Sequence, residues 1–449
     1  MKRYYRVTGK KVVALALLLS MLVTGCSLPG KSRVEEYVPP EETKDVSSEE
    51  EEVIGMSAED ASYAALDYLK VMSLEEKVGQ LFNVNLELLD DSHGSYYELQ
   101  KFSAQMKETL ETYPVGGVTL FSRNIVNRKQ TRKLLRKLQE NSRTPLFVSV
   151  DEEGGDVARI GNNPKMNTTT FPTMEKIGEE KDADYVYRMA STIGKEIWEL
   201  GFNVDFAPVA DVRTSELNRE IGSRSFGSDP DMVAQMVDAY VQGLESANVC
   251  STLKHFPGQG SADGDTHQGS VDIDSSIASL RQIDFKPFES GIAAGADFIM
   301  VSHISVSKVT ESSEPASMSD LIMTTILRDE LGFDGLIITD AFDMASITEN
   351  YSAAEAASGS FMAGADIILM PENLGEAFRA IVDKVEDGTI TMKRLDDTVL
   401  RILQLKFEKG IMTLEDLTEA QQRAEAAPTT QAEETATPKP EKKKSRNKS

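Results

Sequence analysis

Eight short apolar runs, separated by longer stretches with helical character, constrain the fold of this chain more than any other feature. They cover residues 81–86, 117–121, 146–150, 204–208, 249–253, 298–301, 336–339 and 367–370. Short strands that alternate with helices are typical of βα units and a parallel sheet, and eight such units close a barrel. We therefore predict one α/β catalytic domain, a TIM-type (β/α)8 barrel, over residues 58–412. A capping-box pattern at Ser73 and Glu76 marks the helix that leads into the first strand.

Polar residues follow most of these predicted strands. They are Asp151 after the third, Asp211 beyond the fourth, Lys254 and His255 after the fifth, Ser302 and His303 after the sixth, and Asp340 after the seventh. An apolar strand does not need such an ending for packing. In a βα barrel the carboxyl ends of the strands face the same side, where the βα loops converge. The pattern therefore predicts a functional site at this end of the barrel.

The densest polar stretch runs from residue 254 to residue 267 and is rich in glycine. Three of the four histidines, His255, His267 and His303, lie on the strand-end loops, whereas His93 lies apart in a polar turn. In Asp265-Thr266-His267 the carboxylate can accept a hydrogen bond from one ring nitrogen and make the other nitrogen a better base. These residues predict an acid/base dyad. The alternative is that Asp265 caps a helix and His267 is an ordinary surface histidine.

Several motifs together resemble glycoside hydrolase family 3, and within it the NagZ-type exo-β-N-acetylglucosaminidases of bacterial cell-wall turnover. The resemblance covers nearly all of residues 72–410. It rests on the segments at 72–82, 116–121, 150–155 with Arg159, 203–211, 224–227, 254–267 and 335–340. The combination Lys-His-Phe-Pro-Gly with Asp-x-His is the most specific of these motifs. In this group the Asp-His pair marks the acid/base loop, whereas the β-glucosidases and β-xylosidases of the family usually take a glutamate from a separate domain.

The resemblance implies a role for each matching residue. Asp340 is expected to be the nucleophile, His267 the general acid/base and Asp265 its partner. The residues expected to bind the terminal sugar are Asp151, Arg159, Arg224, Lys254 and His255, and we add the strand-end histidine His303. Carboxylates and cationic donors hold sugar hydroxyls well. The expected reaction is a retaining double displacement, with substrate-assisted hydrolysis through the acetamido group as the rival route.

Three further carboxylates lie beside these residues. Asp340 directly follows an apolar strand, whereas Asp343 falls in the next turn, where an aspartate is usually a cap. Asp340 is therefore the preferred nucleophile. Glu152 and Glu153 are expected to be structural, through hydrogen bonds within the loop before Gly154.

The N-terminus carries the pattern of an export signal. Five cations precede the apolar run 12–23, which is too short to span a bilayer, and residues 22–26 resemble a bacterial lipobox that ends in Cys26. We expect residues 1–25 to be a lipoprotein signal peptide, Cys26 to be lipidated and the protein to be anchored outside the cytoplasmic membrane. An ordinary signal peptide with a chance cysteine is the alternative. Residues 26–57 are predicted to be an acidic, disordered tether, and residues 413–449 a low-complexity tail that is basic at its end.

Charge and cysteine content exclude some classes of function. A formal net charge of −25 argues against a nucleic-acid partner, whose phosphates need a basic surface. Only two cysteines occur, so neither a disulfide framework nor a cysteine-rich zinc site is expected. Cys250 is predicted to be a small buried apolar residue. We expect a carbohydrate substrate, no cofactor and a monomer.

The sequence is compatible with other functions. A metal-dependent barrel hydrolase could use His255, Asp265, His267, His303 and Asp340 as ligands, but the first four predicted strands contain no histidine. A family 3 β-glucosidase or β-xylosidase and a non-catalytic sugar-binding lipoprotein are further alternatives. Gln259 and Asp156 depart from the family pattern, which leaves the aglycone open, and the choice between water and phosphate as acceptor is also open.

Overall fold

The computed structural model describes residues 55–93 and 97–426, and each predicted strand region overlaps an observed strand. The parallel strands are β1 (Phe82–Asn85), β2 (Gly117–Thr119), β3 (Phe147–Val150), β6 (Val204–Asp205), β7 (Thr252–Phe256), β8 (Phe298–Val301), β9 (Leu336–Thr339) and β10 (Ile368–Leu369). A short antiparallel hairpin of β4 (Glu152–Gly154) and β5 (Val157–Ala158) lies in the loop after β3.

These parallel strands form a ring. One sheet has the order β10-β1-β2-β3-β6, and a second has the order β7-β8-β9. A parallel bridge between Val204 and Cys250 joins β6 to the start of the β7 segment, and another between Ile338 and Ile367 joins β9 to the β10 segment. Every neighbouring pair in the ring is parallel, as βα connections require. The predicted (β/α)8 barrel is confirmed.

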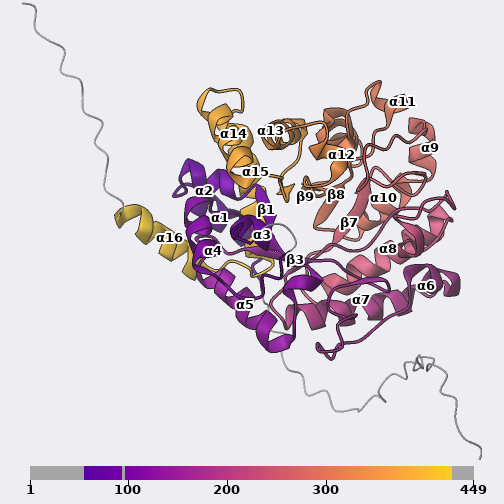
Figure 1. Ribbon diagram of the computed structural model, residues 1–449, viewed down its shortest axis with the longest axis horizontal. Coiled ribbons are helices and arrows are strands. Elements are labelled where there is room, and N and C mark those ends of the chain that lie inside the picture. The colour runs from indigo at the N-terminus through magenta and orange to yellow at the C-terminus, as the bar shows by residue number, and fades with distance from the viewer. Residues whose placement is uncertain (1–54, 94–96, 427–449) are drawn as a thin grey trace, which may run out of the picture. The chain divides into compact units, whose positions relative to one another are not determined.

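Helices surround the ring (Figure 1). The longer ones are α1 (Ala58–Leu69), α4 (Ala104–Thr112), α5 (Arg128–Glu140), α7 (Ala183–Trp198), α8 (Pro230–Glu245), α10 (Phe285–Ala293), α13 (Ala353–Ala363), α14 (Leu374–Glu386), α15 (Met392–Glu408), α16 (Leu414–Ala426) and the π-helical segment η4 (Leu321–Glu330). Shorter helices are α2 (Leu74–Gly79), α3 (Leu86–Leu89), α6 (Met174–Glu180), α9 (Ile277–Gln282), α11 (Ser307–Thr310) and α12 (Ala345–Thr348), with 3₁₀ turns η1 (Ser122–Asn124), η2 (Gly222–Arg224) and η3 (Ala316–Met318). The predicted capping box of Ser73 and Glu76 starts α2.

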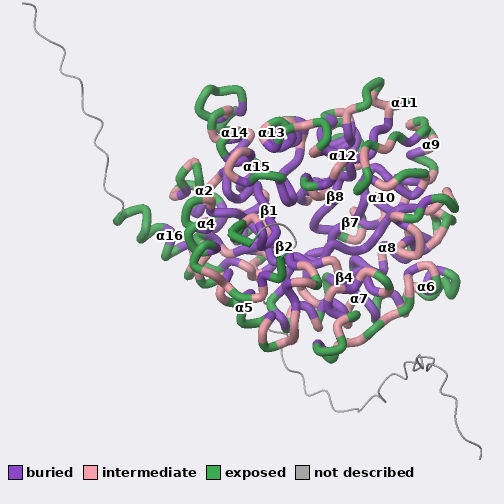
Figure 2. The backbone as a smooth tube through the Cα atoms, viewed as in Figure 1, coloured by how far each residue is buried: buried purple, intermediate pink, exposed green. Residues whose placement is uncertain are grey.

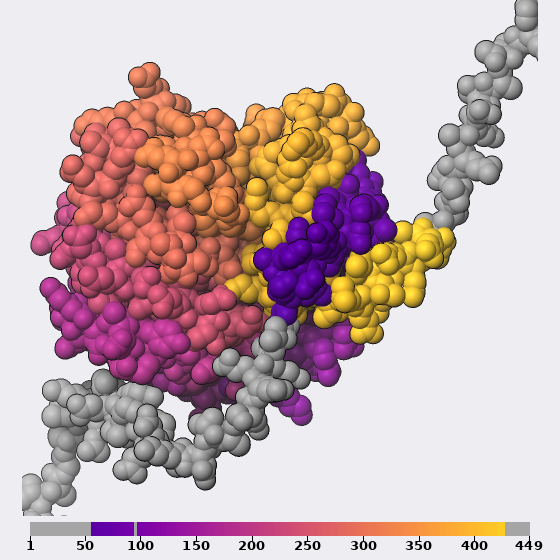
Figure 3. Space-filling model, turned by 180° about the vertical axis from the view of Figure 1, so that it is seen from behind, coloured from indigo at the N-terminus to yellow at the C-terminus, as the bar shows by residue number. Residues whose placement is uncertain are grey.

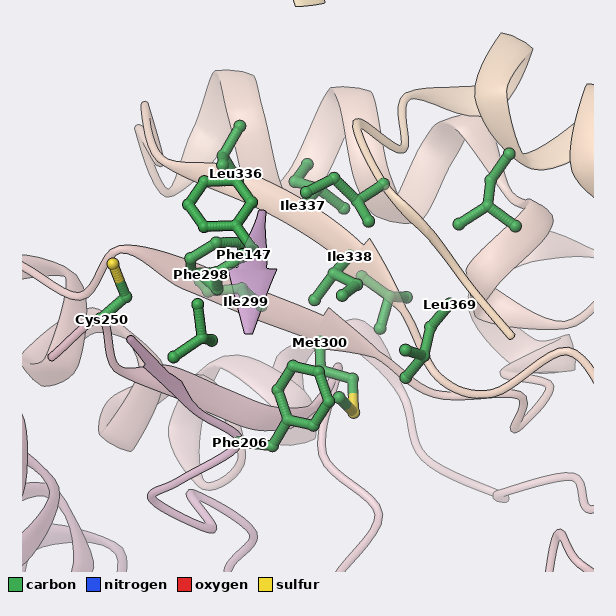
Figure 4. Close-up of a cluster of buried hydrophobic side chains, with 14 of the residues drawn as sticks. Phe147, Phe206, Cys250, Phe298, Ile299, Met300, Leu336, Ile337, Ile338 and Leu369 are labelled. Atoms are coloured by element: carbon green, nitrogen blue, oxygen red, sulfur yellow. The ribbon is translucent and has the colours of Figure 1, made fainter. Parts of the chain in front are cut away.

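The core occupies the inside of the ring and the space between the ring and the helices. Phe147 and Phe298, from β3 and β8, meet edge to face with ring centroids 5.3 Å apart. Figure 4 shows them together with Phe206, Met300 and the buried side chains of β9. Figure 2 shows the buried strands at the centre and exposed helix surfaces at the rim. Cys250 is a buried free thiol in this core, as predicted.

The fifth strand lies further along the chain than predicted. We expected residues 249–253, but β7 spans Thr252–Phe256 and contains Lys254 and His255 instead of ending before them. Pairing with β8 passes from Lys254 opposite Met300 to Phe256 opposite Val301, so His255 is the extra residue of a bulge. The bulge leaves His255 out of the ladder, and pairing resumes at Phe256.

The folded body also extends beyond the predicted C-terminal boundary at residue 412. Residues 414–426 form α16, whose Leu417 and Ala420 are buried, and α16 lies beside α1 (Figure 3). These two apolar residues, three positions apart, share one face of the helix and pack it onto the body. The predicted tail is therefore corrected in its first part.

Several predictions fall outside the described residues. The signal peptide, Cys26, most of the predicted tether and residues 427–449 belong to this group. At the N-terminal end of the described residues, the backbone N–H of Met56 donates to Phe407 O (3.2 Å) and Ser57 caps α1. Within the described residues, no helix combines the length and the apolarity needed to cross a bilayer.

Candidate active site

A cavity of about 380 Å³ opens at the carboxyl ends of the strands. Its polar lining comes from β7 itself and from the loops after β2, β3, β6, β7 and β9. The charged and histidine side chains in this lining are Arg123, Asp151, Glu153, Arg159, Glu220, Arg224, Lys254, His255, His267, Asp340 and Asp343. Most of the residues predicted from the sequence therefore lie together. Asp265 and His303 are not part of this lining.

Asp151 and Lys254 form the centre of a buried charge network. Lys254 Nζ lies 2.8 Å from Asp151 Oδ1 and 2.6 Å from Glu153 Oε1. Arg159 adds a contact of 3.3 Å to the other oxygen of Asp151. Burial would raise the pKa of Asp151, but the charges of Lys254 and Arg159 outweigh it and hold the pKa well below its usual range. Asp151 is therefore an anion that can accept hydrogen bonds from sugar hydroxyls.

Glu153 belongs to the same network, contrary to the purely structural role that we expected for it. Arg224 binds Glu153 with two nitrogens, at 2.9 Å from Nε and 2.7 Å from the terminal Nη2. Burial alone would raise the pKa of Glu153, but the charges of Arg224 and Lys254 hold it at about 2. Sequence reasoning placed Arg224 at the site but missed the carboxylate that fixes its orientation.

Glu152, by contrast, has the structural role that the sequence predicted. Its two oxygens accept hydrogen bonds from the backbone N–H groups of Ile160 and Gly161, each 2.7 Å long. Its burial raises its pKa to about 7. Gly155 follows in the left-handed region (φ 62°), where a side chain would collide with Thr173. The hydrogen bonds of Glu152 and the backbone conformation at Gly155 thus fix the loop that carries Asp151 and Glu153.

His255 is the bulged residue of β7, and its ring lines the cavity. Its Nδ1 lies 2.7 Å from Asp211 Oδ2, and its backbone N–H donates to the same oxygen (3.2 Å). The other oxygen of Asp211 accepts the backbone N–H of Gln259 (2.6 Å). Asp211 is itself fully buried, so it fixes the tautomer of His255 and leaves Nε2 for a ligand.

The hydrogen bond predicted between Asp265 and His267 is present. His267 Nδ1 lies 3.0 Å from Asp265 Oδ1, and the His267 side chain is 64% exposed at the cavity rim. A second carboxylate, Glu220 Oε1, lies 3.2 Å from the same nitrogen. The hydrogen bond to Glu220, together with the charges of Glu220 and Asp340, raises the pKa of His267 to about 9. The predicted dyad is therefore a group of three.

Glu220 also holds the loop that carries His267. Its carboxylate accepts the backbone N–H of Thr266 (3.0 Å) and the hydroxyl of Thr266 (2.8 Å). Glu220 lies in the loop after β6, far from residue 267 in the sequence. No local sequence pattern indicates that these two residues interact. The one signal in the sequence was its place four residues before Arg224, whose guanidinium donates to Glu220 O (3.1 Å).

Asp340 lies at the end of β9 on the cavity wall, as predicted. Its backbone N–H donates to Val301 O (2.9 Å), and its Oδ1 accepts the backbone N–H of Ala341 (2.8 Å). Asp343 also lines the cavity, although we expected a capping residue in the turn. Desolvation in the cavity and repulsion from Asp340 raise the pKa of Asp343 to about 6. The site therefore holds a second carboxyl group, Asp343, whose pKa the charge of Asp340 helps to raise.

The predicted contact of His303 with substrate is corrected by the structure. His303 Nδ1 lies 2.8 Å from Ser317 Oγ, and Nε2 lies 2.9 Å from Ala341 O. Both ring nitrogens are thus used, and burial lowers the pKa of the ring, so it is neutral. The side chain is fully buried behind the Asp340-Ala341 peptide, which it positions. A strand-end histidine in the sequence cannot reveal which way its ring turns.

Two residues depart from the family pattern near this site. Asp156 accepts the hydroxyl of Ser223 (2.6 Å) on an exposed part of the rim. Gln259 is fully buried, and its side-chain amide has no partner among the described residues. In the described part of the chain, the ligand atoms of Glu220, Asp265 and His267 lie within 4.8 Å of one another and form a group that could hold a metal ion.

Known proteins resemble this chain over most of its length. Residues 73–405 match the glycosyl hydrolase family 3 N-terminal domain. Beta-hexosaminidase A of Pseudoalteromonas piscicida is 36% identical over 330 residues, which are 67% of this chain and 55% of that relative. The beta-hexosaminidase of Xylella fastidiosa is 35% identical over 293 residues, 63% of this chain and 84% of the relative.

A solved structure has the same arrangement. The family 3 β-N-acetylglucosaminidase of a Paenibacillus species superposes with a TM-score of 0.70 at 31% identity, covering 79% of this chain and 68% of that one. This chain thus spans little more than half of the Pseudoalteromonas relative and about two thirds of the Paenibacillus structure. The barrel, the strand-end charge network and the match over residues 73–405 agree, and the chain belongs to glycoside hydrolase family 3.

Proposed function

We propose that this protein is a retaining exo-β-N-acetylglucosaminidase that removes a terminal β-linked N-acetylglucosamine. The observation that carries the proposal is the placement of His267, with its two carboxylate partners, on the same cavity as the strand-end carboxylate Asp340. The beta-hexosaminidase relatives support the choice of sugar. A cavity of about 380 Å³ is small for a ligand site and suits one terminal sugar ring.

In the first step, Asp340 attacks the anomeric carbon while His267 gives its proton to the leaving oxygen. A pKa of about 9 keeps His267 protonated at neutral pH, as a general acid requires. Because Nδ1 is held by Asp265 and Glu220, Nε2 is the nitrogen that faces the substrate. The C–O bond to the aglycone breaks, and a covalent glycosyl ester forms on Asp340.

In the second step, the neutral His267 takes a proton from water, and the resulting hydroxide displaces Asp340 from the sugar. The two carboxylates on Nδ1 stabilise the imidazolium that forms again. Meanwhile Asp151, Lys254, Arg224 and Arg159 hold the sugar hydroxyls. Arg159 Nε is buried and has no acceptor among the described residues.

A panel of aryl β-glycosides tests the proposed substrate. We expect kcat/KM for the N-acetyl-β-glucosaminide to exceed that for the β-glucoside by about a hundredfold or more, because groups that bind the acetamido function lose their partner in the glucoside. Equal or greater activity on the β-glucoside or β-xyloside would overturn the proposal. Running the panel with and without phosphate, and identifying the product, separates hydrolysis from phosphorolysis.

We further propose that Cys26 carries a lipid that anchors the enzyme outside the cytoplasmic membrane, and that muropeptides are its substrates. The lipobox-like residues 22–26 support the anchor. Metabolic labelling with a fatty acid tests it. The wild-type chain should take up label and fractionate with membranes, whereas Cys26→Ser should do neither; label on Cys26→Ser would contradict the anchor. Release of N-acetylglucosamine from purified peptidoglycan fragments tests the substrate.

A further inference from the structure

Helix α5 presents a row of cations that the catalytic site does not use. Lys129, Arg132, Lys133 and Arg136 are exposed and follow the spacing i, i+3, i+4, i+7, which places them on one face of the helix. The opposite face, with Leu134, Leu135 and Leu138, is buried against the barrel. This basic face, residues 129, 132, 133 and 136, lies in a chain whose net charge is −25.

In the described part of the chain, nearby acids pair with only one residue of this basic face, Arg136. Glu199 pairs with Arg128 (2.5 Å), and Glu140 pairs with Lys137 (2.7 Å) and Arg136 (3.5 Å). Among the described residues, Lys129, Arg132 and Lys133 have no acidic partner within ion-pair distance. The first turn of α5 contains no acid, although cations there oppose the helix dipole. The local sequence therefore keeps positive charge where helix stability alone would favour the other sign.

The surface beside the basic face is hollowed on both sides. One hollow of about 980 Å³ lies between α5 and the end of α7 and includes Trp198, the single tryptophan of the chain. The other, of about 500 Å³, includes Lys101 and Phe102. Proteins that contact the headgroup region of a bilayer often present cations together with partly buried aromatic rings. The basic face of α5 has such rings on both sides.

We propose that the basic face of α5 docks the body of the protein onto a bilayer of anionic lipid. This inference goes beyond the proposed catalytic function and does not depend on it. Each exposed Lys or Arg near an anionic surface contributes attraction, and the acidic charge of the chain as a whole is repelled, so the basic face turns the folded body toward the bilayer. If Cys26 is anchored as proposed, the 29 peptide links from Cys26 to Gly55 reach at most about 100 Å and keep the body close to the bilayer.

The docking leaves the catalytic cavity open to the side. Helix α5 returns the chain from the carboxyl end of β2 to the amino end of β3, so it runs along the side of the barrel. The preceding turn, η1, contributes Arg123 to the cavity. The cavity mouth therefore lies at one end of the docked helix and faces along the bilayer, where polymer fragments outside the membrane can enter it.

Vesicle binding by the chain from residue 27 tests the proposal, since the described contacts all lie within residues 55–426 and this chain lacks only the leader and the lipid. The test variant is Lys129→Gln/Arg132→Gln/Lys133→Gln, which keeps good helix formers. The matched control is Lys165→Gln/Lys176→Gln/Lys393→Gln, three exposed lysines that do not belong to α5. All proteins keep the basic C-terminal residues, and thermal melting shows that each is folded.

The wild-type chain should sediment with vesicles that contain phosphatidylglycerol, but not with pure phosphatidylcholine, and should be released at about 0.5 M salt. The α5 variant should bind about a hundredfold more weakly, and the control variant should bind like the wild type. Equal binding of the α5 variant and the wild type, or no binding by the wild type, would overturn the proposal. Tighter binding to soluble polyphosphate than to vesicles would overturn it too, because the partner would then be a polymer.

Discussion

Lys254 and Lys406 are buried at opposite ends of the barrel, and they differ in the charge of their neighbours. Lys254, in β7, lies against Asp151 and Glu153 at the carboxyl ends of the strands. Lys406, on α15, reaches the amino ends of β1 and β2, where it donates to Gln80 Oε1 (2.8 Å) and Gly116 O (3.0 Å) and lies 4.8 Å from the centre of the Phe147 ring. None of these last partners carries a charge.

The neighbours decide the charge state of each lysine. Burial alone would lower the pKa of Lys254, but the charges of Asp151 and Glu153 outweigh it and raise the pKa. Burial of Lys406 is not opposed, and its pKa falls to about 7. A charged network at the cavity end is thus maintained for a ligand, whereas the lysine at the other end serves packing and can lose its proton.

The largest effect should come from Lys254→Met. This change leaves Asp151 and Glu153 buried without their shared cation, and breaking such a pair costs about 3–5 kcal/mol of unfolding free energy. The sugar-binding geometry is lost with it, so kcat/KM on an aryl N-acetyl-β-glucosaminide should fall more than about a hundredfold. Urea unfolding and steady-state kinetics measure the two effects. A folded Lys254→Met enzyme with wild-type activity would show that the Lys254 charge network is not needed for the reaction.

Lys406→Met should act on stability and its pH dependence, and leave kcat/KM within about twofold of wild type. With a pKa of about 7 in the folded state and 10.5 in the unfolded chain, the unfolded state binds more protons between these values. Wild-type stability should therefore rise from pH 7 to pH 10, by about 3 kcal/mol from this residue. Urea unfolding at both pH values measures the rise. Lys406→Met should lack this contribution, and the same rise in both proteins would refute the assignment.

Glu220→Gln should change the pH profile of the reaction. The hydrogen bond and charge of Glu220 raise the pKa of His267, so their loss moves the basic limb of the kcat/KM profile from about pH 9 toward 6.5. Asp265→Asn, the matched change at the exposed partner, should shift the limb less. A Glu220→Gln profile that coincides with wild type would show that Glu220 only holds the loop.

The smallest effect should come from a chelator. No step proposed for Asp340 or His267 needs a metal, so dialysis against EDTA should leave the rate within error of the starting value. Glu220, Asp265 and His267 nevertheless could hold an ion. Loss of activity that zinc restores would favour the metal-dependent alternative.

The fold and much of the cavity could be predicted because both follow from local patterns. Eight apolar runs place the strands, and a polar residue after a strand must lie at the carboxyl end of the barrel. Asp151, Lys254 and Asp340 were found in this way. The shift of β7 was not predictable, because the bulge at His255 depends on pairing with β8 and not on the sequence of β7 itself.

Contacts between distant loops explain the residues that were missed. Glu153 and Glu220 act through Arg224 and His267, and no spacing in the sequence connects those pairs. His303 shows the complementary error, because its position was right but its ring turns to Ser317 and Ala341 instead of the cavity. Side-chain direction at a strand end is set by tertiary packing.

The most direct test of this account is to trap the glycosyl-enzyme with a fluorinated N-acetylglucosamine analogue and to map the modified residue by mass spectrometry of peptides. Asp340 should carry a covalent adduct, and the neighbouring Asp343 should carry none. An adduct on Asp343, or turnover of the substrate with no adduct on any residue, would contradict the assignment of Asp340 as the nucleophile.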